Sequence, residues 1–487
     1  MVRYRTVWGF GLAVLLLGFS VTRATVRELL MESAGLDPAA LSSTPSIRLL
    51  GMGDLSLSVP DESNELNTHD FGGSISGVLE DGERWVAESW LGNHRRTVEH
   101  ADYGAERRYG HGGFQLIRRW PGRAMGADFE YSYFEDAESD AGWSKIRGPR
   151  LSGMFNQRIG PVTAGLILGR ESEDEARITP DFFAIRHQQD RWLGQLGVET
   201  QCFGMRWGAA WDFERGDVVG KGIDAARFHE DTFTWTRPLN RYSFFALLKP
   251  RPGLEGGVRL RGLDRQGSER ALVSWSGESP YNPSGTNYSA EAISFFEEES
   301  DWDVKTLWRA HGSGGMTVAA EAGYRAWDHR VDEGTEFKGS LRAGRAQRKI
   351  YSLGAGASRR VLAGRVLLAL EGRGAIEDWV MEEPQPAAAD GTSRRASVGA
   401  GLEFFATDRL MLRGGFSLFS EDQNIDRPVT LRTGNALSGG LSWVPRGGLL
   451  QVQAGVRHER AVPKEEISTN LEKTDETQFA LGLRWLL

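Results

Sequence analysis

The feature of this sequence that most constrains its fold is a two-residue alternation of apolar and polar side chains. In residues 127–133 and again in residues 479–487, apolar or aromatic side chains occupy every second position, and polar or small ones occupy the positions between. Successive side chains of an extended strand point to opposite faces, so this pattern gives a strand one apolar and one polar face. The same pattern recurs in residues 318–324, 366–371, 410–418 and 450–457.

The connections between these segments have two different compositions. Each segment runs about ten residues, the length that a tilted strand needs to cross a bilayer. Short stretches rich in turn formers join segments in pairs and longer polar stretches separate the pairs, which is the asymmetry of outer-membrane barrels. The predicted tight turns are Trp120-Pro121-Gly122, Gly160-Pro161, Arg237-Pro238-Leu239-Asn240, Ala406-Thr407-Asp408-Arg409 and Pro445-Arg446-Gly447-Gly448. The predicted polar loops lie around 137–147, 172–190, 214–226, 264–285, 374–393, 420–433 and 459–475.

These patterns predict an all-β fold, a transmembrane antiparallel up-and-down β-barrel with roughly 16 to 20 strands. The count depends on residues 240–345, where 249–253 and 312–315 both have the composition of short turns. If both are short turns, the inward-facing and outward-facing positions of the strands nearby no longer follow a consistent alternation. The soluble alternatives, a β-propeller or a repeat solenoid, predict a motif that recurs once per blade or repeat, and the sequence contains no such repeat.

The beginning of the chain has the composition of an export signal. Arg3 and Arg5 precede an apolar run over residues 7–21, and Ala24 offers a small residue for cleavage. This order predicts a signal peptide over residues 1–24, with an uncleaved anchor as the alternative. An exported barrel is expected in the outer membrane of a Gram-negative bacterium. Its expected partners are the lipid bilayer and, through the C-terminal strand, the barrel-assembly machinery.

Several functional classes lack support in the residues. The formal net charge of −8 argues against nucleic acid as a partner. The sequence has no Gly-x-Ser-x-Gly, no His-Glu-x-x-His and no phosphate-binding glycine loop, so we predict no enzyme, no cofactor and no metal site. A barrel hydrolase stays as an alternative, because its site would assemble from distant strands. Acidic clusters at 171–175 and 297–301 predict solvated loops, with divalent-cation binding as the alternative.

Charged residues also occur in the polar phase of the alternation. A charged side chain that faces lipid at mid-depth costs ~2–4 kcal/mol, so these residues are expected to point inward or to lie at the interfaces. Two interpretations stay open, an anion-attracting passage and a filled lumen in which arginines and carboxylates pair. The lumen-facing candidates are Arg259, Arg261, Glu321, Arg325, Arg365, Glu371, Arg413, Arg457 and Arg484.

Residues 46–73 carry a local motif. Arg48 is followed by Gly51-Met52-Gly53, then by an alternating stretch that ends in Val59, and then by Asp61 and Asn67. This order resembles the opening of long-chain fatty-acid transporter-like outer-membrane proteins and of the related secretion-system shuttle barrels. The Asn-Pro-Ala-Gly turn of that family is missing, and Phe71-Gly72-Gly73 stands near its place.

The resemblance implies that this segment folds inside the barrel as a plug or hatch, and that the barrel has about 14 strands if it follows the family strictly. The plug candidates are Arg48, Gly51, Met52, Gly53, Asp61 and Asn67. The expected organisation is a signal peptide over 1–24, a periplasmic N-terminal extension with a short helix over 25–45, a plug-like segment and entry to the barrel over 46–83, and the barrel over 84–487.

The expected function follows from the barrel and the resemblance together. We expect a barrel that binds or passes a small solute across the outer membrane, a hydrophobic one if the family's cargo applies. The continuous apolar tunnel of a fatty-acid carrier is not visible in the sequence. The alternatives are a structural or docking barrel with an occluded, charged lumen and an open diffusion porin that favours anions.

Overall fold

The computed structural model describes one residue near the N-terminus, Met52, and most of the chain from residue 84 onward. The described ranges are 84–99, 104–138, 142–178, 183–224, 229–236, 239–275, 288–335, 340–382, 389–425, 427–445, 448–463 and 473–486. The predicted signal peptide, the N-terminal extension and all of 46–83 except Met52 lie outside the described residues. Among the described residues, no helix is long and apolar enough to span a membrane.

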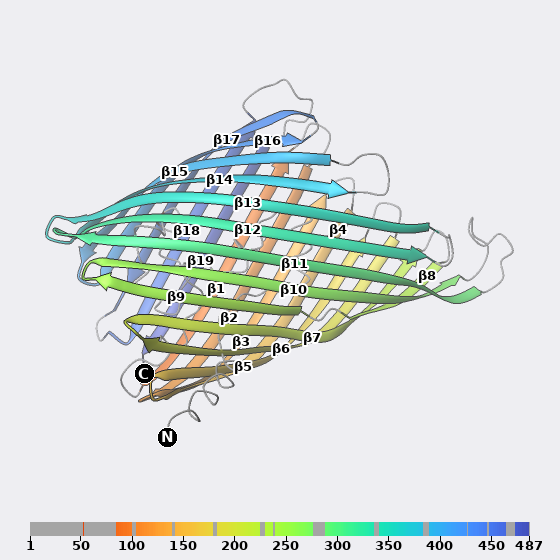
Figure 1. Ribbon diagram of the computed structural model, residues 1–487, viewed down its shortest axis with the longest axis horizontal. Coiled ribbons are helices and arrows are strands. Elements are labelled where there is room, and N and C mark those ends of the chain that lie inside the picture. Colours follow the sequence, from red (N-terminus) through yellow and green to blue (C-terminus); the bar gives the residue numbers. More distant parts are fainter. Residues whose placement is uncertain are drawn as a thin grey trace, which may run out of the picture.

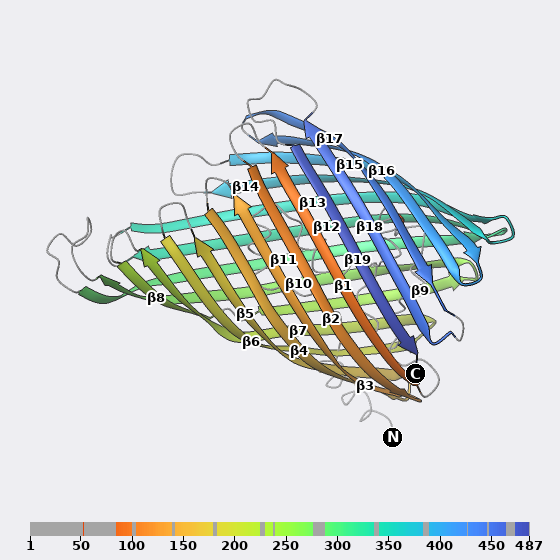
Figure 2. The ribbon, with the colours of Figure 1, turned by 180° about the vertical axis from the view of Figure 1, so that it is seen from behind.

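The described strands form one antiparallel sheet that closes on itself (Figures 1 and 2), because the first strand pairs with the last from Val86↔Leu486 to Glu99↔Lys473. The strands are β1 (Arg84–Glu99), β2 (Gly104–Trp120), β3 (Arg123–Glu138), β4 (Gly142–Ile159), β5 (Val162–Ile178), β6 (Phe183–Cys202), β7 (Met205–Asp224), β8 (His229–Thr236), β9 (Leu239–Arg251), β10 (Leu254–Trp275), β11 (Tyr288–Gly312), β12 (Met316–Thr335), β13 (Ser340–Val361), β14 (Val366–Glu382), β15 (Ala389–Thr407), β16 (Leu410–Ile425), β17 (Arg427–Trp443), β18 (Leu450–Pro463) and β19 (Lys473–Leu486). The predicted fold class, an all-β antiparallel barrel, is therefore confirmed.

Strands β8 and β9 occupy a single position in the wall. Thr236 at the end of β8 and Leu239 at the start of β9 continue the same register against β7 and against β10. The tight turn predicted at 237–240 is therefore wrong, because the chain does not reverse there. Pro238 has no backbone N–H to donate to the hydrogen bonds between strands, and prolines are therefore more common in turns than in strands. This is why the composition of 237–240 resembles that of a turn. With β8 and β9 counted together, the barrel has 18 strands, within the predicted range and above the number that the resemblance implies.

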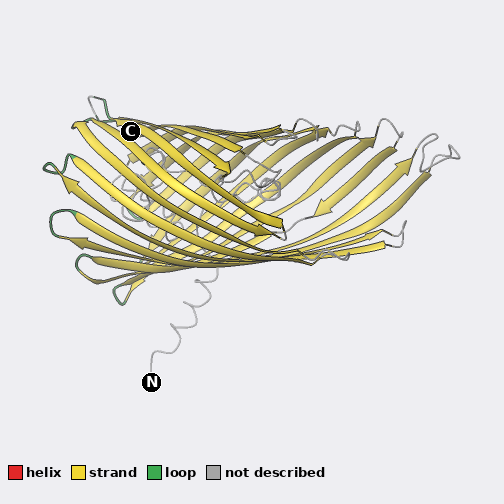
Figure 3. Ribbon diagram, turned by 90° about the horizontal axis from the view of Figure 1, so that it is seen from above, coloured by secondary structure: helices red, strands yellow, loops and turns green. Residues whose placement is uncertain are grey.

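Because the chain does not reverse at 237–240, both 249–253 and 312–315 can be short turns while the strands between them keep their inward and outward faces. Both are short turns at the same end of the barrel, because β9 continues into β10 at 252–253 and β11 into β12 at 313–315. Figure 3 shows the short turns gathered at this end, which we call the short-turn end, and the opposite end is the long-connection end. The turns predicted at 120–122, 160–161, 406–409 and 445–448 also lie between consecutive strands there.

The strands are longer than the sequence pattern predicts. Much of each stretch predicted as a polar loop is paired strand: β5 and β6 take up most of 172–190, and β16 and β17 take up most of 420–433. These predictions are wrong because backbone pairing needs no apolar face. A strand that leaves the lipid can continue with polar side chains on both sides.

The alternation places apolar residues outside and polar residues inside. On β3, the predicted outer residues Phe129 and Tyr131 are exposed, whereas Glu130 and Ser132, which alternate with them, are buried. At the long-connection end, the apolar outer surface stops at aromatic side chains such as Tyr324 and Tyr351, whose ring centroids are 5.1 Å apart. Farther along the same strands, Asp328 pairs with Arg345 at 2.6 Å. This change from aromatic to charged side chains marks the edge of the lipid-facing belt.

Aromatic rings of the belt cover glycines on the neighbouring strand. Trp302 on β11 lies over Gly262, its partner on β10, so closely that a Cβ at Gly262 would overlap the indole ring. Replacing Gly262 by Val is expected to displace this ring and to lower the free energy of unfolding by about 1–3 kcal/mol. Urea unfolding in lipid vesicles measures the change. The control is Gly372→Val, because a Cβ at Gly372 meets its nearest neighbour at an ordinary 3.8 Å. Equal losses in the two variants would contradict this packing.

An ion pair joins the first and last strands beyond the apolar belt. Nε2 of His94 on β1 lies 3.0 Å from Oε1 of Glu476 on β19. The outward neighbours Arg95 and Asp475 are charged, so this part of the seam lies outside the lipid. Burial raises the pKa of Glu476, but the hydrogen bond and charge of His94, with the charge of Arg96, lower that pKa from 4.5 to about 2.

A carboxyl group whose pKa is lowered by folding stabilises the barrel above its unfolded-state pKa, and this stabilisation is lost as the pH falls through the folded-state value. Replacing Glu476 by Gln is therefore expected to lower the free energy of unfolding by about 1–2 kcal/mol near pH 6. The difference from the unmodified protein should fade between about pH 4.5 and pH 2. Unfolding titrations across this range test it, with the exposed Glu99→Gln as the control. A difference that does not depend on pH would refute the assignment.

Candidate functional site

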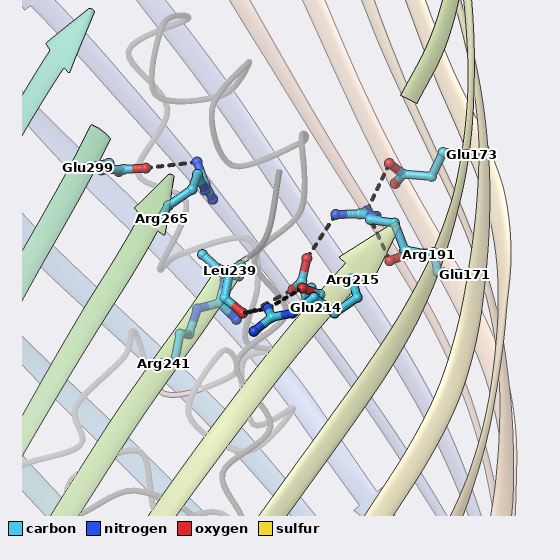
Figure 4. Close-up of polar contacts among 9 residues, drawn as sticks. All are labelled: Glu171, Glu173, Arg191, Glu214, Arg215, Leu239, Arg241, Arg265 and Glu299. Carbon is cyan, nitrogen blue, oxygen red and sulfur yellow. Dashed lines mark hydrogen bonds and ion pairs between the residues drawn. The ribbon is translucent and has the colours of Figure 1, made fainter. Parts of the chain in front are cut away.

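The inner face of the barrel is joined by ion pairs between neighbouring strands. In the sector from β5 to β7, Arg191 on β6 is buried among three carboxylates (Figure 4). Its Nη2 lies 3.1 Å from Glu171 and 3.1 Å from Glu173, both on β5, and its Nη1 lies 3.0 Å from Glu214 on β7. One guanidinium therefore connects three strands through charge-assisted hydrogen bonds, which are stronger than neutral ones.

The pairing continues on the next strands. Glu214 also lies 3.9 Å from Arg241 on β9, and Arg265 on β10 lies 2.8 Å from Glu299 on β11. Figure 4 shows these groups on the same side of the wall as Arg191. The indole Nε1–H of Trp327 on β12 donates to Glu299 at 2.8 Å. These contacts link β5, β6, β7 and β9 to one another, and β10, β11 and β12 to one another.

A second run follows closer to the short-turn end. Arg259 on β10 lies 2.8 Å from Asp303 on β11, and Lys305 on β11 lies 2.6 Å from Glu321 on β12. Arg373 on β14 reaches Glu321 at 3.6 Å and Glu371 at 3.4 Å. Opposite charges thus compensate each other along the inner face. This arrangement matches the filled-lumen interpretation of the sequence better than a wall of unpaired arginines.

The most deeply buried of these pairs joins β15 and β16. Nε of Arg413 lies 3.2 Å from Oε2 of Glu403, and the Glu403 side chain has no exposed surface. A buried carboxylate without a cation is strongly unfavourable, so each side chain of the pair depends on the other. Gly415 follows Arg413 by two residues on the same face of β16.

The acidic clusters at 171–175 and 297–301 do not lie in solvated loops, so that prediction is wrong. Residues 171–175 belong to β5 and 297–301 to β11, and Glu171, Glu173 and Glu299 are buried. Glu171 and Glu173 meet Arg191 on β6, Glu299 meets Arg265 on β10, and Asp301 meets Arg325 on β12. Across the described residues, no group of three or more His, Cys, Asp or Glu side chains is arranged to hold a metal ion.

The nine lumen-facing candidates are distributed over three situations. Arg259, Glu321 and Glu371 belong to the second run above, and Arg413 pairs with Glu403. Arg325 pairs with Asp301 at 2.5 Å. Arg457 pairs with Glu459 at 2.6 Å, Arg484 pairs with Glu88 across the β1–β19 seam, and Arg261 faces Asp212 and Asp303. Arg365 is exposed in the turn between β13 and β14.

The cluster around Arg191 is not predicted from the sequence. Glu173 and Glu214 fall in stretches predicted as polar loops and Arg191 directly follows one, so the phase of the alternation was not followed there. The signal was present, because Arg191 and Leu193 share one face of β6 while Trp192 lies on the other. Following the alternation beyond ten residues would have placed Arg191 on the inner face.

Of the plug candidates, only Met52 is among the described residues, and Arg48, Gly51, Gly53, Asp61 and Asn67 lie outside them. The Met52 side chain is completely buried and clusters with Leu367 and Ala369 of β14. Its backbone lies against Gly415 of β16, where an added Cβ would overlap the Met52 carbonyl group. Met52 thus contacts the inner face at two strands, beside the Arg413–Glu403 pair.

Comparisons with known proteins give a fold likeness and no family. No protein-family model matches the chain, and no curated protein matches it. The toluene transporter of Ralstonia pickettii is 11% identical over 90% of this chain and 97% of its own, with a TM-score of 0.37. The toluene transporter of Pseudomonas putida is 9% identical with the same coverage and a TM-score of 0.39. The ferric yersiniabactin uptake receptor of Yersinia pestis is 8% identical over 84% of this chain and 80% of its own, with a TM-score of 0.40.

These likenesses say nothing about what this chain binds. The fatty-acid transporter-like family stays a prediction from residues 46–73. The class of protein follows from the molecule itself, since it closes an antiparallel sheet, faces outward with an apolar belt and turns its charges inward. These are the features of an outer-membrane β-barrel.

The Arg191 cluster predicts a large and local effect on stability. Replacing Arg191 by Met removes the cation that Glu171, Glu173 and Glu214 share, and is expected to lower the free energy of unfolding by about 3–5 kcal/mol. The matched control is Arg170→Met, because Arg170 makes an exposed contact of 3.5 Å with Asp190 and its loss should cost less than about 1 kcal/mol. Urea unfolding in vesicles compares the two. Similar losses in the two variants would contradict the prediction that the buried cluster contributes more to the free energy of unfolding than an exposed ion pair.

Proposed function

We propose that this barrel passes a small polar solute across the outer membrane through a lumen that the N-terminal segment closes. The proposal rests on two observations together, the charged inner face and the burial of Met52 on that face. Met52 contacts Leu367, Ala369 and Gly415, and we call these three residues the seat of Met52. The lumen-facing candidates and the plug-like role of residues 46–73 belong to this proposal.

The chemistry of the inner face favours a polar solute over a hydrophobic one. The side chains that line β5 to β12 include many arginines and carboxylates held in pairs. An apolar solute that passes such a wall gains little contact and obstructs the hydration of the charged groups. A solute with hydroxyl, amide or charged groups can exchange hydrogen bonds with them. Because the charges are paired, the proposal commits to polarity and not to an anion.

The contacts of Met52 support a closing role for the segment. Met52 packs on Leu367 and Ala369, and its backbone approaches Gly415 at a place where a larger residue would not fit. Burying a Met side chain stabilises by about 1.5–3 kcal/mol, a contact that holds a segment without fixing it permanently. A seat of this strength suits a closure that opens at times.

The test compares solute entry through the unmodified barrel and through a barrel with a damaged seat. Replacing Gly415 by Val places side-chain atoms where the Met52 backbone lies, and should raise the entry of small sugars and amino acids into vesicles several-fold. The adjacent Gly414→Val is the control, because a Cβ at Gly414 meets nothing within 4 Å. Removal of residues 46–73 should raise entry at least as much as Gly415→Val.

The outcomes separate the alternatives. No entry through any of the barrels, including the one without 46–73, would reject solute passage and favour the structural or docking barrel, which the charge-compensated lumen also suits. Entry that is equally high in the unmodified protein would reject closure and favour an open porin. Selective entry of fatty acids would reject the polar solute.

A further inference from the structure

Three adjacent turns at the short-turn end form one basic surface. They are held together by backbone hydrogen bonds, since Arg360 N–H donates to Gly315 at 3.1 Å and Phe405 N–H donates to Arg365 at 2.9 Å. Val444 N–H then donates to Arg409 at 2.9 Å, which ties the third turn to β17. We call this surface the basic edge, and its members are Arg359, Arg360, Arg365 and Arg409. The β13–β14 turn projects at the left end of Figure 1.

Three of the four arginines of the basic edge are exposed, whereas Arg360 lies over the ring of Phe405. The exposed ones are Arg359, Arg365 and Arg409. Within the part of the chain that the structure describes, none of these three guanidinium groups forms an ion pair, and Asp408 is the acidic residue of these turns. This local excess of positive charge contrasts with the formal net charge of −8 for the whole chain. On the inner face, by contrast, the described charges are paired across strands.

An apolar side chain stands at the tip of the same surface. Leu362 is 73% exposed and has a φ of 52°, and Ala363 beside it has a φ of 55°. Left-handed backbone disfavours side chains with a Cβ, and glycine or asparagine is the ordinary choice in such a turn. The turn therefore gives no structural reason for Leu362. Leu362 instead lies in the turn that leads into β14, where Leu368 is exposed, and Phe404 is exposed on the neighbouring β15, so this turn borders the lipid-facing belt.

We propose that the basic edge binds the headgroups of anionic phospholipids in the leaflet at the short-turn end. Leu362 would enter the boundary between headgroups and acyl chains, while the three exposed guanidinium groups meet phosphate oxygens, for which their planar donor geometry is suited. Its continuity with the apolar belt favours lipid over a soluble acidic protein, because the same surface already borders the bilayer. The site is independent of solute passage and of the seat of Met52.

The test measures lipid binding by the purified full-length barrel in detergent, with native mass spectrometry as the readout. Phosphatidylglycerol should be retained more strongly than phosphatidylcholine, and the preference should weaken as salt rises. The variant Arg359→Gln/Arg365→Gln/Arg409→Gln should bind phosphatidylglycerol about tenfold more weakly and leave phosphatidylcholine unchanged. Leu362→Asn should weaken both lipids to a smaller extent, without loss of folding, because asparagine tolerates the left-handed backbone.

The matched control removes three exposed cations near the long-connection end, in Arg147→Gln/Lys349→Gln/Arg394→Gln. It should retain the preference for phosphatidylglycerol. Heat-modified mobility on gels verifies that every variant has closed its barrel. Equal retention of the two lipids by the unmodified protein, or equal loss in the two triple variants, would overturn the proposal. Binding of an acidic protein without any preference for phosphatidylglycerol would overturn it as well.

Discussion

The whole structure depends on the absence of hydrogen-bonding partners in the hydrocarbon of a membrane. Every backbone N–H and C=O that crosses the bilayer must be paired within the sheet, and every charged side chain must turn away from lipid. Pairing β1 with β19 satisfies the first demand, because it leaves no open edge. The two-residue alternation satisfies the second, because it sends Glu130 inward between Phe129 and Tyr131. One constraint therefore explains both the closure and the sequence pattern.

Turning so many charges inward creates a second demand, which neighbouring strands meet together. A buried charge is tolerated only beside its partner, so Arg191 requires strands β5 and β7, and Arg413 requires β15. Each strand is thus fixed in register by its neighbours through side chains as well as through the backbone. A wall held in this way is poorly suited to open by moving a strand. Under the proposed function, the movement that admits a solute is then expected in the segment that contains Met52.

The sequence predicts faces and turns well wherever the local pattern decides them. The turns at 120–122 and 160–161 and the orientation of Phe129 could be predicted, because steric rules and the period of a strand are local. Pro238 could not be interpreted correctly, since a proline interrupts the ladder whether or not the chain reverses, and only the register of Thr236 and Leu239 against β7 and β10 distinguishes the two.

For the candidate site the limit is different. The phase of the alternation singles out Arg259 and Arg413, but their partners Asp303 and Glu403 are set by the register between strands, which the sequence does not state. The reason why Arg191 was not identified is different, because it directly follows a stretch predicted as a loop. A polar stretch outside the apolar belt has the composition of a loop, and yet it continues as paired strand, because water as well as protein can satisfy the outward side chains there.

The seat of Met52 illustrates how a charged wall can hold an apolar segment. Leu367, Ala369 and Gly415 form a small apolar patch on a face that carries many charged side chains. In the Arg413–Glu403 pair beside this patch, the two charges compensate each other. Met52 is buried there without replacing a partner of that ion pair. The contact is worth roughly 1.5–3 kcal/mol, whereas breaking a buried pair of the wall would cost about 3–5 kcal/mol. The contact of Met52 is therefore weaker than a buried pair of the wall, and under the proposed function its release leaves those pairs intact.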